Sequence, residues 1–302
     1  MEHYLKAHKR LPETVALLVA LMWGLWWIPV RYLNQIGFEG IWGGLTINLG
    51  ATLLLLFFVI ILRRFKIVSP RSLAGAFCIG FGVTAYAGAL SFTHVANAVL
   101  LFYLAPAWST IIECFFLGRK WRWQSLLAIG SSLTGMFLIF GGNLIFVEIK
   151  IGDAMALISG IVWSIGIALI FSTETKGNIT ILSFYCMSFS VMLGLVFWFV
   201  GGTTLGVLPV ADDIITKGPM ALVIGAIYFT PLIFLSIWTT TLIAPALVCF
   251  LLSFEILSGI GSSAMLLDEP FGLIQIAGTV FIILGAVIEV LIPDRAKKPQ
   301  LG

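Results

Sequence analysis

Four ionisable side chains lie inside long apolar segments of this sequence: Arg31, Glu113, Glu255 and Glu289. A charge in the hydrocarbon layer of a membrane costs about 3 kcal/mol or more, so such residues are default candidates for binding substrates or protons. Glu255 is the strongest candidate because it falls near the middle of its segment, far from either membrane surface. A carboxylate there needs a cationic partner, which could be a substrate, a proton or Arg31. The alternative is a structural glutamate hydrogen-bonded to a helix end.

Aromatic residues form the second candidate set. Trp23, Trp27 and Arg31 recur every four residues, so one helix face would carry all three. This stripe could lead a carboxylated substrate outward; the alternative is an interfacial tryptophan belt with a snorkelling arginine. Tyr86 and Tyr103 lie on helix faces that also carry small or polar residues. Such faces point toward protein or a water-filled cavity, so both tyrosines are expected to line a central cavity, with small-residue packing as the alternative.

Composition shows what kind of protein positions these side chains. The chain has 302 residues, of which 60% are hydrophobic and 10% charged, and its mean hydropathy is +1.09. A soluble domain carries about 25% charged residues, so a soluble globular protein is excluded. Unbroken apolar runs such as 45–62 are too long for the alternating strands of an outer-membrane barrel. The sequence therefore predicts an all-α membrane protein.

Ten apolar segments are long enough to cross a bilayer. They span approximately residues 13–34, 41–63, 71–92, 96–118, 123–142, 152–172, 180–201, 218–239, 244–267 and 271–292. With a cytoplasmic amino terminus, 14 of the 17 Lys and Arg residues fall in the segments that stay inside, and only Lys150 and Lys217 fall in outer loops. Positively charged loops remain in the cytoplasm, so both termini are predicted to be cytoplasmic.

The two halves of the sequence are weakly similar. Trp23 corresponds to Trp163 at an offset of 140 residues, and Gly135 corresponds to Gly285 at an offset of 150. Five segments in each half is an odd number, so the second half would enter the bilayer from the opposite side. An inverted repeat of this kind places a substrate site near the midplane between the halves. The predicted five-helix units are residues 1–147 and 148–302.

Several motifs resemble the EamA type of the drug/metabolite transporter superfamily. They are the run Met22–Val30 (MWGLWWIPV), the segment Ala89–Ala98 followed by Tyr103–Pro106, and Leu267–Pro270 (LDEP). The resemblance covers nearly the whole chain and implies a ten-helix transporter. Around residues 103–142 the chain is most similar to bacterial aromatic amino-acid exporters of this superfamily. Arg119 and Ile256 depart from the family pattern, which has Glu and Pro at these positions.

The expected function is secondary transport of a small organic metabolite, an aromatic or other amino acid-like compound, outward by alternating access. One alternative is uptake of a quaternary ammonium or other small cation, held by aromatic rings and Glu255, because aromatic faces attract such cations. An integral membrane enzyme or a channel is the other alternative. The expected substrate-binding residues are Trp23, Trp27, Arg31, Tyr86, Tyr103, Trp163, Tyr228 and Glu255.

The motifs that the sequence lacks bear on its cofactors and partners. Phosphate-loop, zinc-protease and nucleophile-elbow motifs are missing from it, and its cysteines lack metal-ligand spacing, so no enzyme activity, cofactor or metal is expected. The expected partners are a small-molecule substrate and the lipid bilayer, without nucleic acid, and proton coupling is left open. The expected state is a monomer or homodimer in the bacterial inner membrane.

Overall fold

The computed structural model of the chain describes residues 10–63, 68–139, 150–173, 178–267 and 272–291, and these contain helices and no strand. The helices of the first half are α2 (Leu11–Gly24), α3 (Trp27–Gln35), α4 (Trp42–Ile61), α5 (Pro70–Phe92), α6 (Val95–Phe102), α7 (Ala105–Phe116) and α8 (Trp123–Ile139). Those of the second half are α9 (Ile151–Phe171), α10 (Ile179–Gly201), η1 (Gly202–Leu205), α11 (Ala211–Thr216), α12 (Gly218–Ile224), the π-helix η2 (Gly225–Phe229), α13 (Thr230–Thr240), α14 (Pro245–Leu252), α15 (Glu255–Leu267) and α16 (Leu273–Leu291).

Each predicted segment coincides with one helix or with several short helices in succession. Seven helical segments of the described chain are long and apolar enough to cross a membrane: Leu11–Gln35, Trp42–Ile61, Pro70–Phe92, Ile151–Phe171, Ile179–Leu205, Gly218–Thr240 and Pro245–Leu266. The prediction of a polytopic helical membrane protein is therefore confirmed. The count of ten and the side on which the termini lie stay predictions. Most of the Leu267–Pro270 motif lies outside the described residues.

Three of the predicted segments are broken near their middles. Proline has no N–H for the carbonyl four residues earlier, so Pro29 leaves the carbonyl of Leu25, and Pro106 that of Phe102, without a helical donor. The breaks follow at those points, between α2 and α3 and between α6 and α7. The break between α14 and α15 forms without a proline, because Ile256 N–H bonds the carbonyl three residues earlier instead of four.

The helix boundaries of the two halves repeat at a constant offset. α6 and α14 each contain eight residues, and both ends of α14 lie 150 positions after those of α6. α15 and α16 likewise begin 150 positions after α7 and α8. In the α8–α16 interface, Ser131 Oγ donates to the carbonyl of Phe281, again 150 positions later, at 2.6 Å.

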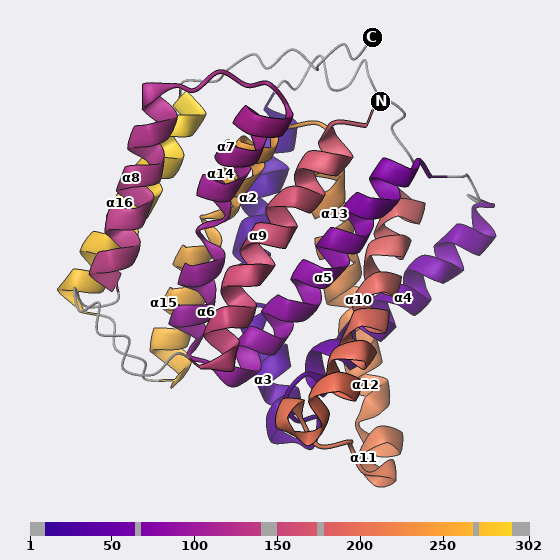
Figure 1. Cartoon of the computed structure of the whole chain (residues 1–302). Helices are drawn as coiled ribbons and strands as arrows, with labels where there is room; N and C mark the ends of the chain where they lie inside the picture. Colours follow the sequence, from indigo (N-terminus) through magenta and orange to yellow (C-terminus); the bar gives the residue numbers. More distant parts are fainter. Residues whose placement is uncertain (1–9, 64–67, 140–149, 174–177, 268–271, 292–302) are drawn as a thin grey trace.

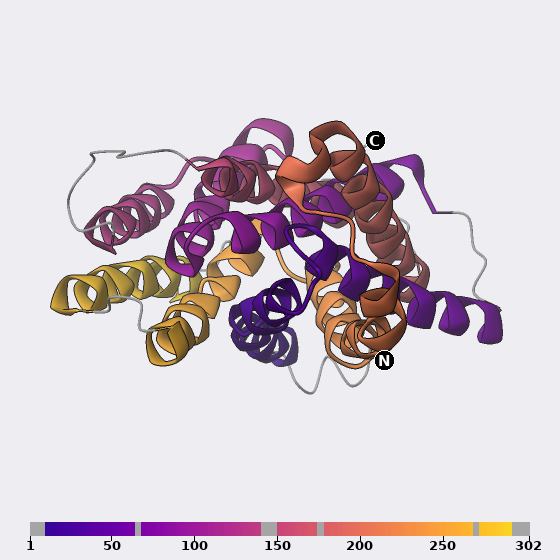
Figure 2. The ribbon, with the colours of Figure 1, turned by 90° about the horizontal axis from the view of Figure 1, so that it is seen from below.

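The helices form an elongated bundle. In Figure 1, α8 and α16 lie side by side at one end and α4 lies at the other, and Figure 2 shows the same order from below. α5 packs against α9 and α10, while α2 packs against α13, α14 and α15. The main apolar core draws buried residues from both halves of the chain, so the halves share one core. Trp23, Trp26 and Trp27, which flank the break after α2, belong to this core.

Gly225 in η2 packs directly on the backbone of α4. A Cβ at this position would overlap the carbonyl oxygen of Ile47 and lie 2.9 Å from the backbone nitrogen of Ala51. We expect Gly225→Ala to lower the free energy of unfolding by about 1–3 kcal/mol, because neither backbone atom can move aside. Reversible unfolding in mixed detergent micelles measures this change.

Gly130→Ala is the matched control. Gly130 lies within α8, and a Cβ there would meet nothing within 4 Å. This variant should gain about 0.5–1 kcal/mol from the higher helix propensity of alanine. Equal stabilities of the two variants would show that the contact between η2 and α4 is not tight.

Candidate substrate site around Glu255

Glu255 begins α15 directly after a helix break, and its side chain is buried. The hydroxyl of Tyr86, from α5, donates to Oε1 at 2.5 Å, and the hydroxyl of Tyr103 lies 2.6 Å from Oε2. The Tyr103 hydroxyl is also 2.7 Å from the carbonyl oxygen of Leu252. That carbonyl would accept from Ile256 N–H in an unbroken helix, so the break presents it to Tyr103.

Gly24 allows α2 to approach this carboxylate closely. A Cβ on Gly24 would overlap the Ser258 side chain and the Glu255 carbonyl oxygen, and would lie 2.6 Å from Gly259 N. The face of α15 that carries Ser258 and Gly259 therefore packs against α2. The family-like Trp23–Gly24 pair is what permits the close approach.

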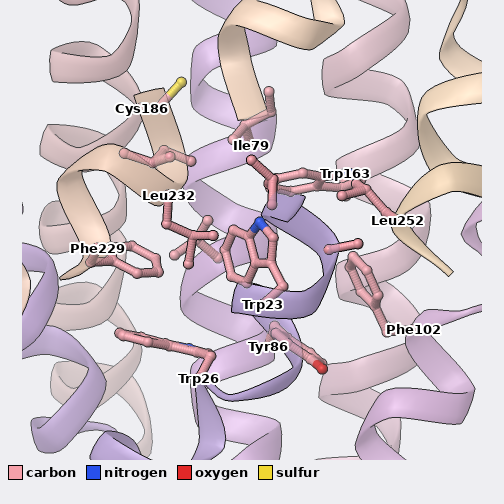
Figure 3. Packing of buried hydrophobic residues seen from close by; sticks show 14 of the residues in the cluster. Trp23, Trp26, Ile79, Tyr86, Phe102, Trp163, Cys186, Phe229, Leu232 and Leu252 are labelled. Carbon is pink, nitrogen blue, oxygen red and sulfur yellow. The ribbon is translucent and has the colours of Figure 1, made fainter. Parts of the chain in front are cut away.

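Aromatic rings from both halves enclose the carboxylate. The pocket is lined by Trp23, Gly82, Val83, Tyr86, Phe102, Trp163, Leu252 and Glu255. Trp23 lies among the other rings in Figure 3, with its ring centroid 5.7 Å from that of Trp163 and 6.5 Å from that of Tyr86. The Tyr86 and Phe102 ring centroids are 4.8 Å apart. The remaining volume is about 10 Å³, close to the space of one water molecule, so the pocket is closed to any organic substrate.

Trp163 contributes a buried donor that is unused among the described residues. Its side chain is 3% exposed, and its indole Nε1 has no hydrogen-bond partner there. The indole of Trp23, which is equally buried, donates to Ser236 Oγ at 3.0 Å. Leaving a buried donor unpaired costs about 1–3 kcal/mol, so the Trp163 N–H is available to a hydrogen-bond acceptor on a ligand.

The structure brings together five of the eight predicted residues: Trp23, Tyr86, Tyr103, Trp163 and Glu255. Trp27 and Tyr228 lie beside the pocket. Trp27 Nε1 donates to Ser262 Oγ at 2.9 Å, and Tyr228 on η2 donates to the carbonyl of Met22 and stacks on Trp26. Both residues fasten α2 and α3 to the second half of the chain.

Arg31 lies away from Glu255. Its guanidinium donates to the carbonyls of Leu90 at 3.2 Å and Thr93 at 2.9 Å, at the carboxyl end of α5. It lines a separate open cleft of about 410 Å³ together with His94 and Lys150. The single stripe predicted for Trp23, Trp27 and Arg31 is interrupted by the break between α2 and α3, which lies between Trp23 and Trp27. The hydrogen bonds of the three side chains go to Ser236, to Ser262 and to the end of α5.

The other two candidate glutamates are Glu113 and Glu289, and Glu113 is not among the residues that line the pocket. Glu113 is buried on α7, where Oε1 accepts from the backbone N–H of Ala246 at 2.6 Å and Oε2 pairs with Arg119 at 2.8 Å. It therefore caps the first turn of α14, which is a structural role. The side chain of Glu289 lies outside the described residues.

Sequence reasoning missed Phe102 and Leu252, which line the pocket. The sequence did contain a signal, because the two residues correspond at the 150-residue offset of the repeat. The structure shows in addition that each is the last residue before a helix break. It also missed Ser236, which holds Trp23, and a serine inside an apolar segment carries no sign of its partner.

Comparisons with known proteins place the fold. Residues 11–141 match the EamA-like transporter family. Over 200 residues, 60% of this chain, the sequence is 26% identical to a Bacillus subtilis (strain 168) protein named uncharacterized transporter YoaV, and the match spans 64% of that relative, which is less than two thirds of its length. A protein of known crystal structure superposes with a TM-score of 0.66 at 15% identity, over 93% of this chain and 96% of the other. That structural likeness concerns the fold alone.

The two pocket tryptophans should respond differently to the same substitution. Trp23→Phe removes ring volume and the bond to Ser236, whereas Trp163→Phe removes similar volume and an N–H that has no partner in the described part of the chain. We expect Trp23→Phe to cost at least about 1 kcal/mol more in free energy of unfolding than Trp163→Phe. Unfolding of both variants in the same micelles measures the difference. A larger cost for Trp163→Phe would show that its N–H is bonded in the folded protein.

Proposed function

We propose that the chain is a secondary transporter of the EamA-like transporter family, whose model matches residues 11–141, and that Glu255 lies in its central site. The transported compound is a small organic metabolite. The observation that carries the proposal is a buried carboxylate held by Tyr86 and Tyr103 and enclosed by aromatic rings. Such a site binds a cationic group electrostatically and an apolar or aromatic body by contact with the rings.

Alternating access between two inverted five-helix units, residues 1–147 and 148–302, is part of the proposal. The constant offset between the broken helices α6–α7 and α14–α15 supports it. So does the composition of the pocket, to which Tyr86 and Phe102 come from one unit and Trp163 and Glu255 from the other. Rocking one unit against the other would separate these walls and open the closed pocket to one side of the membrane.

We propose export of an aromatic or other amino acid-like compound as the leading substrate assignment. The carboxylate of Glu255 would take the ammonium group of such a compound, and the unpaired N–H of Trp163 would take its carboxylate. Both groups belong to the same pocket, and a charged ligand makes the stronger hydrogen bonds at each.

Uptake of a quaternary ammonium or other cation is the second candidate, and one observation favours it. In the part of the chain that the structure describes, no Lys, Arg or His lines the pocket, and Arg31 lies in a separate cleft. A cation without a carboxylate would use Glu255 and the rings, and would leave Trp163 Nε1 unpaired. Trp163→Phe therefore separates the two candidates.

The setting of the transporter is proposed as well. The apolar helices support a lipid bilayer as its location, and the bacterial relative supports the bacterial plasma membrane, which is the inner membrane where there are two. A monomer or a homodimer would serve, because both sets of pocket residues come from one chain. No feature of the site or the fold in the described part of the chain indicates catalysis, so a membrane enzyme or a channel is a weaker proposal than a transporter.

Counterflow in proteoliposomes tests the central site. Liposomes loaded with unlabelled tryptophan or with choline should accumulate the matching labelled compound. Glu255→Gln should reduce this by about 10- to 150-fold, because a charge-assisted hydrogen bond contributes about 1.5–3 kcal/mol to binding. Glu39→Gln, at an exposed position, is the control and should transport normally. Full transport by Glu255→Gln would disprove the assignment of Glu255.

Reporter fusions test the proposed topology. A fluorescent protein that folds only in the cytoplasm should be active at both the amino and the carboxyl terminus. Alkaline phosphatase inserted near Lys150, in a predicted outer loop, should be active outside. Opposite locations of the two termini would require an odd number of spans and would rule out two five-helix units.

A further inference from the structure

The hydrogen bonds around Glu255 can be counted proton by proton. Three oxygen–oxygen contacts connect the group: Tyr86 to Oε1 at 2.5 Å, Tyr103 to Oε2 at 2.6 Å, and Tyr103 to the Leu252 carbonyl at 2.7 Å. Each contact needs a proton between its oxygens, since two acceptors repel at such distances. The two tyrosines supply only two protons. An ionised Glu255 would therefore leave one contact without a proton.

A protonated Glu255 satisfies all three contacts. Tyr86 donates to Oε1, the carboxylic acid donates from Oε2 to the Tyr103 oxygen, and Tyr103 donates its own proton to the Leu252 carbonyl. The helix break before α15 is what makes that last acceptor available. The arrangement matches the neutral acid and mismatches the carboxylate.

In the part of the chain that is described, the side chains around Glu255 supply no positive charge that would compensate an ionised carboxylate. Among the described residues, the pocket holds no basic side chain, and Glu255 is 2% exposed. The nearby titratable groups on other helices are used elsewhere: Tyr228 on η2 donates to Met22, and Cys249 on α14 pairs with Ser109 at 3.0 Å. With a volume of about 10 Å³, the closed pocket cannot hold a substrate cation beside the carboxylate. An uncompensated buried charge would cost several kcal/mol.

We propose that the empty transporter passes through this closed conformation only with a proton on Glu255, so that a cationic substrate group and a proton exchange across the membrane. The inference rests on the proposed transport function and adds its coupling ion. When the open site faces one compartment, the acid releases its proton to water and the ammonium group pairs with the carboxylate. After the substrate leaves on the other side, Oε2 takes up a proton from that side, and the pocket closes.

Infrared difference spectroscopy tests the proton without any substrate. Purified protein at low and at high pH should differ by a carboxylic-acid C=O band that Glu255→Gln abolishes and Glu39→Gln retains. Tyr103→Phe should shift this band, because it removes the acceptor of the acid proton, while Tyr32→Phe, at an exposed position, should leave it in place. Thermal melting shows whether each variant is folded. A spectrum without a band that depends on Glu255 overturns the inference.

Transport measurements test the exchange separately. In liposomes that hold wild-type protein, choline, which has no neutral form that crosses the lipid by itself, should accumulate about tenfold when the interior is ten times more acidic, because one monovalent cation then exchanges for one proton. Protein-free liposomes should not accumulate it, and dissipating the pH gradient should abolish the accumulation. Choline transport that ignores the gradient overturns the exchange and leaves the transport function standing. A Glu255-dependent band without transport of tryptophan or choline supports the proton site and contradicts the proposed substrates.

Discussion

Burial of a single carboxylate between the two halves of the chain is the constraint on which the rest of the structure depends. Glu255 is buried, so its carboxyl oxygens need protein partners, and Tyr86 and Tyr103 reach it from two different elements of the first half. These contacts require α5, the α6–α7 break and α15 to meet at one point. The site is therefore also a joint between the halves, and any movement that opens the pocket must break these bonds.

The helix breaks make the contacts of Glu255 possible. α6 and α14 end at the breaks, and their last residues, Phe102 and Leu252, line the pocket. Leu252 shows the consequence, because its carbonyl accepts from Tyr103. A continuous helix would satisfy this carbonyl internally and would leave Tyr103 to the carboxylate alone. The break thus provides a third oxygen, and this oxygen makes the site selective for one protonation state of Glu255.

Close backbone packing holds the bundle around the site. Gly24 brings α2 onto the first turn of α15, and Gly225 brings η2 onto α4. α8 and α16 also approach each other closely at glycines, with Gly135 against the carbonyl of Gly278 and Gly285 against the carbonyl of Ala128. These positions are mates at the 150-residue offset, so the contact is the same on both sides of the interface. In a membrane, where apolar side chains gain little by leaving lipid, such close contacts supply much of the helix association.

The sequence by itself determined the class of protein, most segment positions and the central residue. Hydropathy and helix length are local properties, and an ionisable residue in the middle of an apolar segment is costly wherever it packs, which is why Glu255 was predicted. The tertiary structure decided which aromatic residues reach it. The four-residue spacing of Trp23, Trp27 and Arg31 implied one face of one helix, but the helix is interrupted between Trp23 and Trp27, and Arg31 bonds the end of α5. Tyr103 and Trp23 bond residues more than 130 positions away in sequence, and so does Glu113 through Ala246, and no local pattern encodes such contacts.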